Sequence, residues 1–468
     1  MREMRLEHDL LGEREVPAEA YYGIQTLRAK ENYNITGIPI SYYPRLIHSL
    51  AYIKKASALT NRDLGLLEAR IADAISQACD EIVQGSWHEE FVVDVIQGGA
   101  GTSTNMNANE VIANRALEIL GYAKGRYDVV HPLNHVNMSQ STNDVYPTAL
   151  RMTLSMKMDG LRVEMDRLHQ SLQAKGNEFR DVIKMGRTQL QDAVPMTLGQ
   201  EFEAYRVMVG EDIQRLMEAQ SLIREINMGA TAIGTGLNAH PEYAPRVTDT
   251  LRQVSGVPVV GAANLVEATQ DAGAYVQLSG VLKRIAVKLS KICNDLRLLS
   301  SGPRAGLGEI NLPPMALGSS IMPGKVNPVI PEVVNQVAFE VIGNDIAVTM
   351  AAEAGQLELN AFEPVIAFNL FRSMDMLGRA CRTLAQRCVD GVTANRERCR
   401  WMVEHSIGLV TALNPLLGYE RSTEIARLAQ ESGCSVYEIV LEKGYLSKDE
   451  LDEVLSPENM TRPRYIHH

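Results

Sequence analysis

Four short stretches of this sequence combine glycines, hydroxyl side chains and amides in a way that suits the binding of a small anion. They read QGGAGTSTNMNANE (97–110), NMSQSTNDVYP (137–147), KMGRTQLQDAVPMTLGQ (184–200) and GSSIMPGKVNP (318–328). None of the ten histidines lies in them, and the sequence shows no Ser–His–Asp motif and no phosphate-binding loop. Neutral donors of this kind favour chemistry on a small, doubly anionic substrate whose charge grows during the reaction.

The first two stretches are expected to place hydroxyls where helices begin. Glycines ahead of Thr102, Ser103 and Asn105 permit close backbone approach, so that the hydroxyls and the amide can bind a carboxylate. The alternative is a glycine-rich turn before an Asn-capped helix. Ser141, Thr142 and Asn143 precede a long helical pattern, and a helix N-terminus offers free N–H groups to a carboxylate. The alternative is an ordinary N-cap by Ser, Thr or Asp144.

The third stretch lies between two helical patterns and contains Thr188 and Gln189 beside Arg187 and Asp192. A polar segment next to buried helices must satisfy its hydrogen-bonding groups. The alternative to a ligand site is a connector held by its own hydrogen bonds, with an Arg187–Asp192 salt bridge.

The fourth stretch is predicted to be a lid with Gly318 and Gly324 as hinges. Ile321 and Met322 would be exposed unless the loop closes onto something, which favours a gating lid over a mobile surface loop. The polar side chains available on this lid are Ser319, Ser320, Lys325 and Asn327.

The elements that position these stretches are predicted to be long helices, so that the fold class is mainly α. Apolar residues recur every three or four positions through 147–179, 196–226, 272–299, 331–351 and 363–390. Short links between them indicate a five-helix bundle. Because several helices are apolar on more than one face, we expect a homo-oligomer; a thick monomer with covering loops is the alternative.

Composition excludes several classes of protein. The chain has 468 residues and a net charge of −11, which argues against nucleic acid as a partner. The six cysteines show no metal-ligand spacing and are expected to be inert thiols. No membrane span and no secretion signal are expected, so we predict a cytoplasmic protein. His467 and His468 are given no role.

The four stretches, in this order, resemble the aspartase/fumarase superfamily of homotetrameric lyases, and within it the aspartase family. Further matching blocks are EHDLLGEREVPAEAYYGIQTLRA, NMGATAIGTGLN, KICNDLRLLSSGPRAGLGEINLP, AAEAGQLELN and NPLLGYE. The helical patterns are short up to residue 140 and shorten again near residue 398, so we expect an N-terminal domain (1–140), a central bundle (141–397) with a lid (315–330) and a C-terminal domain (398–468). The resemblance implies the same three-part architecture. It also implies a homotetramer with a twenty-helix core, in which three subunits assemble each active site.

The resemblance also implies a role for each polar residue in the elimination of ammonia from L-aspartate to give fumarate. Ser319 is the expected general base that removes the Cβ proton, supported by Lys325. The expected ligands of the β-carboxylate, on which an enediolate forms, are Thr102, Ser141, Thr142 and Ser320. The expected ligands of the α-carboxylate are Thr188, Lys325 and Asn327, and those of the amino group are Asn143 and Gln189.

Three alternatives stay open at this point. A fumarate hydratase shares most of the blocks, but Gln189 cannot shuttle a proton as a histidine can, and expelling hydroxide needs an acid. A lyase acting on N-substituted aspartates and a non-catalytic helical scaffold are the others. No cofactor and no metal ligands are expected; Mg²⁺ activates some family members, and no spacing here marks a site for it.

Overall fold

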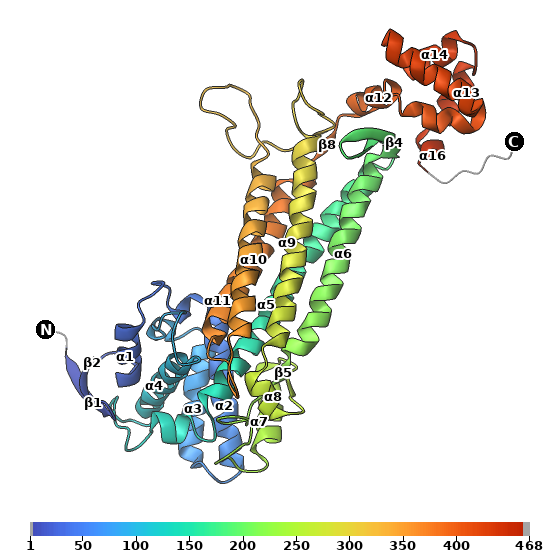
Figure 1. The fold of residues 1–468 in the computed structure, drawn as a ribbon. Coiled ribbons are helices and arrows are strands. Elements are labelled where there is room, and N and C mark those ends of the chain that lie inside the picture. Colours follow the sequence, from blue (N-terminus) through green and yellow to red (C-terminus); the bar gives the residue numbers. More distant parts are fainter. Residues whose placement is uncertain (1–2, 462–468) are drawn as a thin grey trace. The chain divides into compact units, whose positions relative to one another are not determined.

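The computed structural model describes residues 3–461, and it confirms a mainly helical chain (Figure 1). Five long helices dominate the described residues, within a few residues of the predicted bounds. They are α5 (Thr142–Glu178), α6 (Leu198–Ile223), α9 (Gly273–Leu299), α10 (Val329–Glu353) and α11 (Glu363–Arg387). His467 and His468 lie outside the described residues.

Shorter elements precede the first long helix. They are β1 (Met4–Asp9), β2 (Gly12–Pro17), α1 (Ile24–Asn32), η1 (Ile40–Tyr42), α2 (Pro44–Asp63), α3 (Ala69–Val83), η2 (His88–Glu90), α4 (Thr102–Ile119) and η3 (Pro132–Val136). Strands β1 and β2 pair antiparallel, with Met4 opposite Pro17.

The connections between the long helices carry small elements of their own. They are β3 (Ile183–Thr188), β4 (Gln191–Thr197), β5 (Glu225–Ile226), α7 (Tyr243–Ser255), β6 (Val260–Gly261), α8 (Leu265–Gln270) and β7 (Ile310–Asn311). Strands β3 and β4 form an antiparallel hairpin between α5 and α6.

After α11 the elements shorten again. They are η4 (Val389–Gly391), β8 (Thr393–Ala394), α12 (Arg396–Glu404), α13 (Leu409–Ser432), α14 (Val436–Glu442), α15 (Lys448–Val454) and α16 (Pro457–Met460). Helix α13 is kinked at Gly418, whose φ of 78° is not helical. The three-domain boundaries expected from the sequence remain a prediction.

The chain divides into two compact units, and each of the five long helices contributes to both. The first unit contains residues 1–162, 214–284 and 340–376, and the second contains residues 163–213, 285–339 and 377–468. Each unit is described by itself below.

In the first unit, polar bonds tie neighbouring long helices together within an apolar interior. Lys157 on α5 pairs with Asp375 on α11 at 2.6 Å, and Ser279 on α9 donates to Asp345 on α10 at 2.7 Å. Leu150, Leu154 and Leu278 are fully buried, as their helical spacing predicts. Polar bonds as well as apolar packing therefore join the long helices of this unit.

In the second unit, the same helices are joined by a second set of bonds. Tyr205 on α6 donates to Asp295 on α9 at 2.9 Å, and Arg382 on α11 pairs with Glu164 on α5 at 2.6 Å. Asn335 on α10 donates to Asn294 on α9 at 3.0 Å. The β3–β4 hairpin and the lid belong to this unit.

Candidate active site

The first group of predicted site residues lies in the first unit, at the N-termini of α4 and α5. Three successive positive φ angles, at Gly99, Ala100 and Gly101, turn the chain into α4. A Cβ at Gly101 would lie 2.2 Å from the Tyr146 ring, so only glycine fits at this position. Thr102 follows as the first residue of α4, exposed, with its hydroxyl donating to Gly99 O at 2.7 Å.

Helix α5 begins with a reciprocal cap. Ser141 Oγ accepts the N–H of Asn143 at 3.2 Å, and Asp144 Oδ1 accepts the N–H of Ser141 at 3.0 Å. The capping alternative raised by the sequence is therefore present in the structure. It leaves Thr142 as the half-buried first residue of α5, at the positive end of the helix dipole.

The segment before α5 is held by a buried lysine that the sequence did not single out. Lys54 on α2 is fully buried, and its Nζ donates to Asn105 Oδ1 at 2.7 Å, Asn137 Oδ1 at 2.8 Å and Gln140 Oε1 at 2.9 Å. We call these four residues the amide cluster. Asn105 Nδ2 in turn donates to Thr142 Oγ1 at 3.1 Å, which joins the N-terminal turns of α4 and α5.

Two ionisable groups of opposite sign, Lys54 and Asp144, are buried near the N-termini of α4 and α5. Burial lowers the pKa of Lys54 to about 7, and the field of Asp144 opposes that effect. Burial raises the pKa of Asp144 to about 7, against backbone bonds from Ser141 and Thr231. Lys54 and Asp144 are thus buried near the N-terminus of α5, and each favours the charged form of the other.

The second group lies in the second unit, on the β3–β4 hairpin. Gln189 and Leu190 form its tip, and both have positive φ angles, 54° and 63°. Side chains with a Cβ rarely adopt this conformation, and strained turns of this kind gather at functional sites. Thr188 and Gln189 are both exposed there.

A buried ion cluster fixes the base of this hairpin. Glu309 is fully buried, and its carboxylate pairs with Arg187 Nη1 at 2.6 Å and with Lys184 Nζ at 3.2 Å. Lys184 also pairs with Glu201 at 2.7 Å, and these two carboxylates outweigh burial and raise the pKa of Lys184. The expected Arg187–Asp192 pair is long, at 3.8 Å, so Glu309 is the main partner of Arg187.

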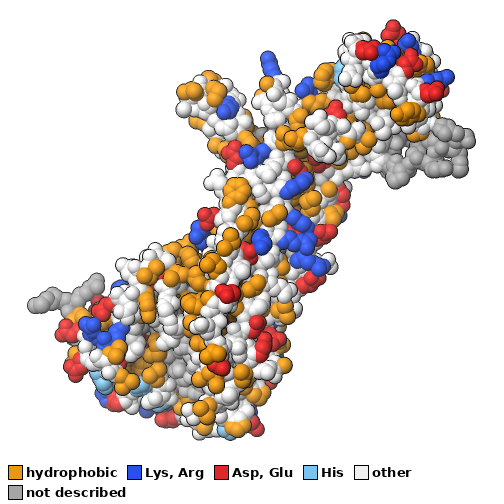
Figure 2. Space-filling view, viewed as in Figure 1, with side chains coloured by type: hydrophobic (Ala, Val, Ile, Leu, Met, Phe, Trp, Pro, Cys, Tyr) orange, Lys and Arg blue, Asp and Glu red, His pale blue; other side chains and the backbone are white. Residues whose placement is uncertain are grey.

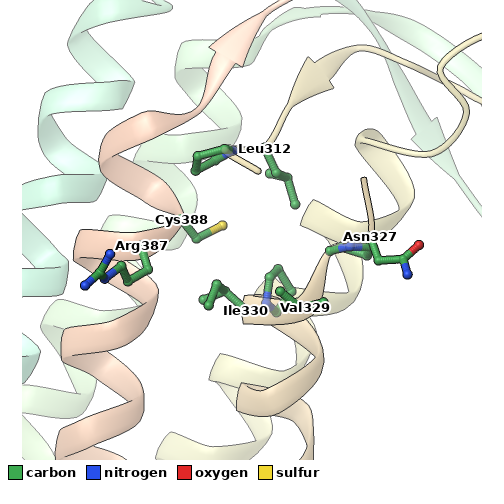
Figure 3. Close-up of a pocket in the computed structure, with 9 residues that line it drawn as sticks. Leu312, Asn327, Val329, Ile330, Arg387 and Cys388 are labelled. Carbon is green, nitrogen blue, oxygen red and sulfur yellow. The ribbon is translucent and has the colours of Figure 1, made fainter. Parts of the chain in front are cut away.

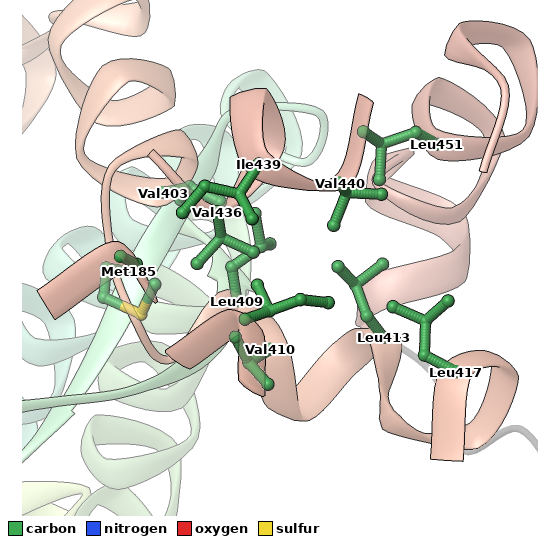
Figure 4. Packing of buried hydrophobic residues seen from close by; sticks show 12 residues of the cluster. Met185, Val403, Leu409, Val410, Leu413, Leu417, Val436, Ile439, Val440 and Leu451 are labelled. Carbon is green, nitrogen blue, oxygen red and sulfur yellow. The ribbon is translucent and has the colours of Figure 1, made fainter. Parts of the chain in front are cut away.

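The helices after α11 support the same hairpin. Met185 of β3 packs into a hydrophobic cluster with residues of α12, α13, α14 and α15 (Figure 4). Leu409 and Leu413 of that cluster are fully buried. The C-terminal helices therefore help to place Thr188 and Gln189.

The third group is the lid, also in the second unit. Ser319 Oγ accepts the backbone N–H groups of Ile321 at 3.2 Å and of Met322 at 3.1 Å. Asn327 Nδ2 donates to Gly318 O at 2.5 Å and so closes the loop on itself. Two backbone donors on one serine oxygen are an arrangement that stabilises an alkoxide.

The two expected hinges differ. A Cβ at Gly318 would lie 1.7 Å from Lys325 O, so close approach requires glycine there, whereas Gly324 has open space and a φ of 79°. Leu317 and Ile321 are highly exposed, and Ser320 and Lys325 also face solvent. In the described structure the lid is thus not closed over a site within its own unit.

Hollows adjoin two of the three groups. A cavity of about 720 Å³ at the base of the lid is lined by Arg297, Ser300, Asn311, Lys325 and Asn327, among others. In the first unit, a hollow of about 260 Å³ is lined by Ser139, Ser141, Thr231 and Asn238, among others. A small pocket lies between the end of α11, Leu312 ahead of the lid and the C-terminal end of the lid, and the Asn327 side chain points away from it (Figure 3).

The predicted site residues thus fall into separate units. Thr102, Ser141, Thr142 and Asn143 belong to the first; the second contains Thr188, Gln189, Ser319, Ser320, Lys325 and Asn327. Lys54 and Glu309 were not predicted from the sequence to belong to the site, whereas Asn105 was expected to bind a carboxylate and instead bonds Lys54 and Thr142. Lys54 follows Ile53 and precedes a second lysine in an ordinary helical pattern, so the only available signal was a cation at a buried helical position.

Several other predictions can be compared with the described residues. Their cysteines are free, and only Cys434 among them is exposed. Among residues 3–461, no group of three or more His, Cys, Asp or Glu side chains is arranged to hold a metal ion. No helix in this part of the chain has the length and hydropathy that a membrane crossing requires.

Comparisons with known proteins agree with the fold and the motifs. Residues 12–343 match the model of the Lyase family, and residues 409–462 match that of the fumarase C C-terminus. Aspartate ammonia-lyase from Pseudomonas fluorescens is 62% identical over 463 residues, which cover 99% of this chain and 97% of the relative.

Two solved structures share the fold nearly end to end. One is described as fumarate lyase:delta crystallin from Brucella melitensis bound to cobalt; its TM-score is 0.96 at 57% identity, covering 98% of this chain and 100% of that one. The other is a class II fumarase from Schistosoma mansoni, with a TM-score of 0.93 at 36% identity, covering 99% and 100%. The chain belongs to the Lyase family and carries the fumarase C type of C-terminal region.

Proposed function

We propose that this chain is a carbon–nitrogen lyase that eliminates ammonia from L-aspartate to give fumarate, reversibly and by way of an enediolate. The substrate class is supported by the near full-length likeness to aspartate ammonia-lyase. The observation that carries the mechanism is Ser319, whose oxygen accepts two backbone N–H groups on the lid.

Ser319 acts as the general base in this proposal. An ordinary serine is a weak base because its alkoxide is unstable in water. The N–H groups of Ile321 and Met322 stabilise negative charge on Ser319 Oγ, and closure of the lid removes competing water. Proton removal from Cβ then places a second charge on the neighbouring carboxylate.

The growing charge on the β-carboxylate is met by Thr102, Ser141, Thr142 and Ser320. Thr142 stands at the N-terminus of α5, where the helix dipole favours an anion. Thr188, Lys325 and Asn327 bind the α-carboxylate, and Asn143 and Gln189 contact the amino group. An ammonium group leaves as ammonia without an added proton, so no acid is needed at Gln189.

Fumarate hydratase is the second candidate, favoured by the likeness to the class II fumarase. Dehydration of malate requires a proton for the leaving hydroxide. Gln189 supplies an amide at the hairpin tip, which does not titrate. For this reason we rank elimination of ammonia first.

The proposal includes a homotetramer in which several subunits share each active site. Exposed apolar side chains on α10 support association of the helices: Phe339 is 63% exposed, and Ile346 and Met350 are 59% and 66% exposed. Hydrophobic side chains are visible along the long helices in Figure 2. Faces of this kind are typical of surfaces that pack against other subunits.

The remaining parts of the proposal concern ligands and location. The partners are small molecules, L-aspartate, fumarate and ammonia, with no cofactor required. A cytoplasmic location is supported by the buried free thiols, since burial raises the pKa of Cys79, Cys293 and Cys381 and keeps them unreactive.

The test is the ultraviolet absorbance of fumarate formed by the purified protein from L-aspartate and, separately, from L-malate. The proposal predicts fumarate from L-aspartate and none from L-malate. Fumarate from L-malate alone would contradict it and would establish the hydratase. Activity only on N-substituted aspartates would keep the lyase chemistry and overturn the substrate.

A further inference from the structure

The hydrogen bonds of the amide cluster run in a defined direction. Neither burial nor stability alone requires this direction. An ammonium group donates and never accepts. Each of the three amides that face Lys54 Nζ must therefore present its oxygen, as the distances of 2.7 to 2.9 Å show. The NH₂ group of each amide is forced to point elsewhere.

For Asn105, the NH₂ group points to two acceptors. Nδ2 donates to Thr142 Oγ1 at 3.1 Å and to Asn137 Oδ1 at 3.1 Å. Asn105 is 1% exposed, so water does not compete for these bonds. The orientation that Lys54 imposes on this amide is therefore passed on to the Thr142 hydroxyl.

Thr142 is the end of this chain of bonds. Because its oxygen accepts from Asn105, its own proton is free to be donated to another group. Within the described part of the chain, the Thr142 hydroxyl has one hydrogen bond, which it accepts from Asn105. Thr102 differs, since its hydroxyl donates to Gly99 O and must leave that acceptor before it can donate to a carboxylate.

We propose that Lys54 and Asn105 are positioning residues that orient the Thr142 hydroxyl proton toward the substrate carboxylate. The chain runs from Lys54 N–H to Asn105 O, from Asn105 N–H to Thr142 O, and from Thr142 O–H to the carboxylate. This inference rests on the proposed function, which assigns Thr142 to the carboxylate. Preorientation of this kind strengthens a donor because no reorganisation is needed as charge develops.

The sharpest test is Asn105→Asp, which keeps the size of the side chain. An ionised carboxylate still satisfies Lys54 but cannot donate to Thr142, and it attracts the Thr142 proton away from the substrate. We expect kcat/KM for L-aspartate to fall about 10- to 100-fold. Asn107→Asp is the matched control, because Asn107 is also buried on α4 but bonds Glu90 O and Val92 N instead. The control should remain within about threefold of wild type.

A double-mutant cycle separates this role from a purely structural one. The Thr142→Val variant has no hydroxyl at position 142 for Asn105 to orient. Adding Asn105→Asp to this variant should therefore lower kcat/KM by less than about twofold further. The proposal is wrong if the double variant loses kcat/KM by the product of the two single losses. It is also wrong if kcat/KM of Asn105→Asp equals that of the wild type. Lys54→Met provides a second route if Asn105→Asp fails to fold, with the same expected lack of additivity. Thermal unfolding identifies which variants are folded.

Binding of succinate, a four-carbon dicarboxylate, separates failure of this inference from failure of the proposed function. Calorimetry on the folded variants does not depend on turnover. We expect Asn105→Asp to weaken succinate binding about 10-fold or more, and Asn107→Asp to leave it unchanged. A wild type that binds succinate but forms no fumarate would contradict the proposed function while leaving this inference to stand. Equal affinities for wild type and Asn105→Asp would overturn the inference.

Discussion

The start of α5 and the lid carry similar polar side chains but differ in how far those side chains are already fixed. Two residues near Thr142, Asn105 and Asp144, are buried. Lys54 donates three hydrogen bonds to amide oxygens there. On the lid, the hydrogen bonds to Ser319 Oγ within the described part of the chain come from backbone groups two and three residues further along, and Ile321 is 83% exposed. The region around Thr142 is preorganised by buried side chains from other elements, whereas the lid is held by bonds within its own loop.

This difference matches the two tasks that elimination sets. Stabilising an enediolate requires donors that do not reorganise as charge develops. Delivering a base to a bound substrate and excluding water requires a segment that can open and close. We infer that the fold places charge stabilisation on helix ends in the first unit and the base on a loop in the second.

The largest effect is expected from Ser319→Ala on the lid. Loss of the general base should reduce kcat about 10²- to 10⁴-fold, because Ser319 is the residue to which the proposal assigns removal of the Cβ proton. The melting temperature and the oligomer should not change, since the partners of the Ser319 side chain among residues 3–461 are nearby N–H groups of the same loop.

Steady-state kinetics and thermal unfolding check this prediction. Ser432→Ala is a matched control, because Ser432 Oγ also accepts a backbone N–H two residues on, from Cys434 at 3.2 Å. It should retain full activity. Near-normal activity of Ser319→Ala would remove the lid from the catalytic account.

A smaller effect, on stability, is expected from Asp94→Asn beside the preorganised region. Asp94 accepts the N–H groups of Thr36, Gly37 and Ile96 at 2.8 to 3.0 Å and precedes the loop that leads to Thr102. Burial raises the pKa of Asp94, but these bonds outweigh burial, and the pKa lies below its ordinary value of 3.8. The amide should lower the free energy of unfolding by about 2 kcal/mol at neutral pH.

The pH dependence of this effect has a definite sign. A carboxyl group with a depressed folded pKa contributes stability above its unfolded pKa of 3.8 and loses it as the pH falls further. The difference in melting temperature between wild type and Asp94→Asn should therefore be constant from pH 7 to about pH 5 and narrow below about pH 4. A difference that widens in acid would show that the bonds to Asp94 are not the cause.

The sequence predicted the helices better than the supports of the site. The spacing of apolar residues predicted α5, α6, α9, α10 and α11. It did so because a repeat every three or four residues can be recognised within each helix, without knowledge of its distant partners. It also located the polar loops, since glycines and hydroxyls cluster there. The partners of those loops, Lys54 and Glu309, are distant in sequence from the residues they hold, so no local pattern marks them.

The division between the units has the same origin. Thr142 and Ser319 are recognisable as site residues from their own neighbours in the sequence. Which of them share a unit depends on how the long helices pack, and that packing is set by contacts hundreds of residues apart. The expectation that several subunits share each active site came from the resemblance to a family of homotetramers. The spacing of residues alone did not predict it.

The central claim is that the preorganised group around Thr142 and the lid group around Ser319, supplied by different subunits, complete one site, and its most direct test is complementation. Thr142→Val and Ser319→Ala chains would be produced together and assayed as mixed oligomers. If different subunits supply the two residues, random mixing at equal amounts should restore about one quarter of wild-type activity. Activity no greater than the sum of the two separate variants would show that one subunit supplies both residues, and would contradict the account.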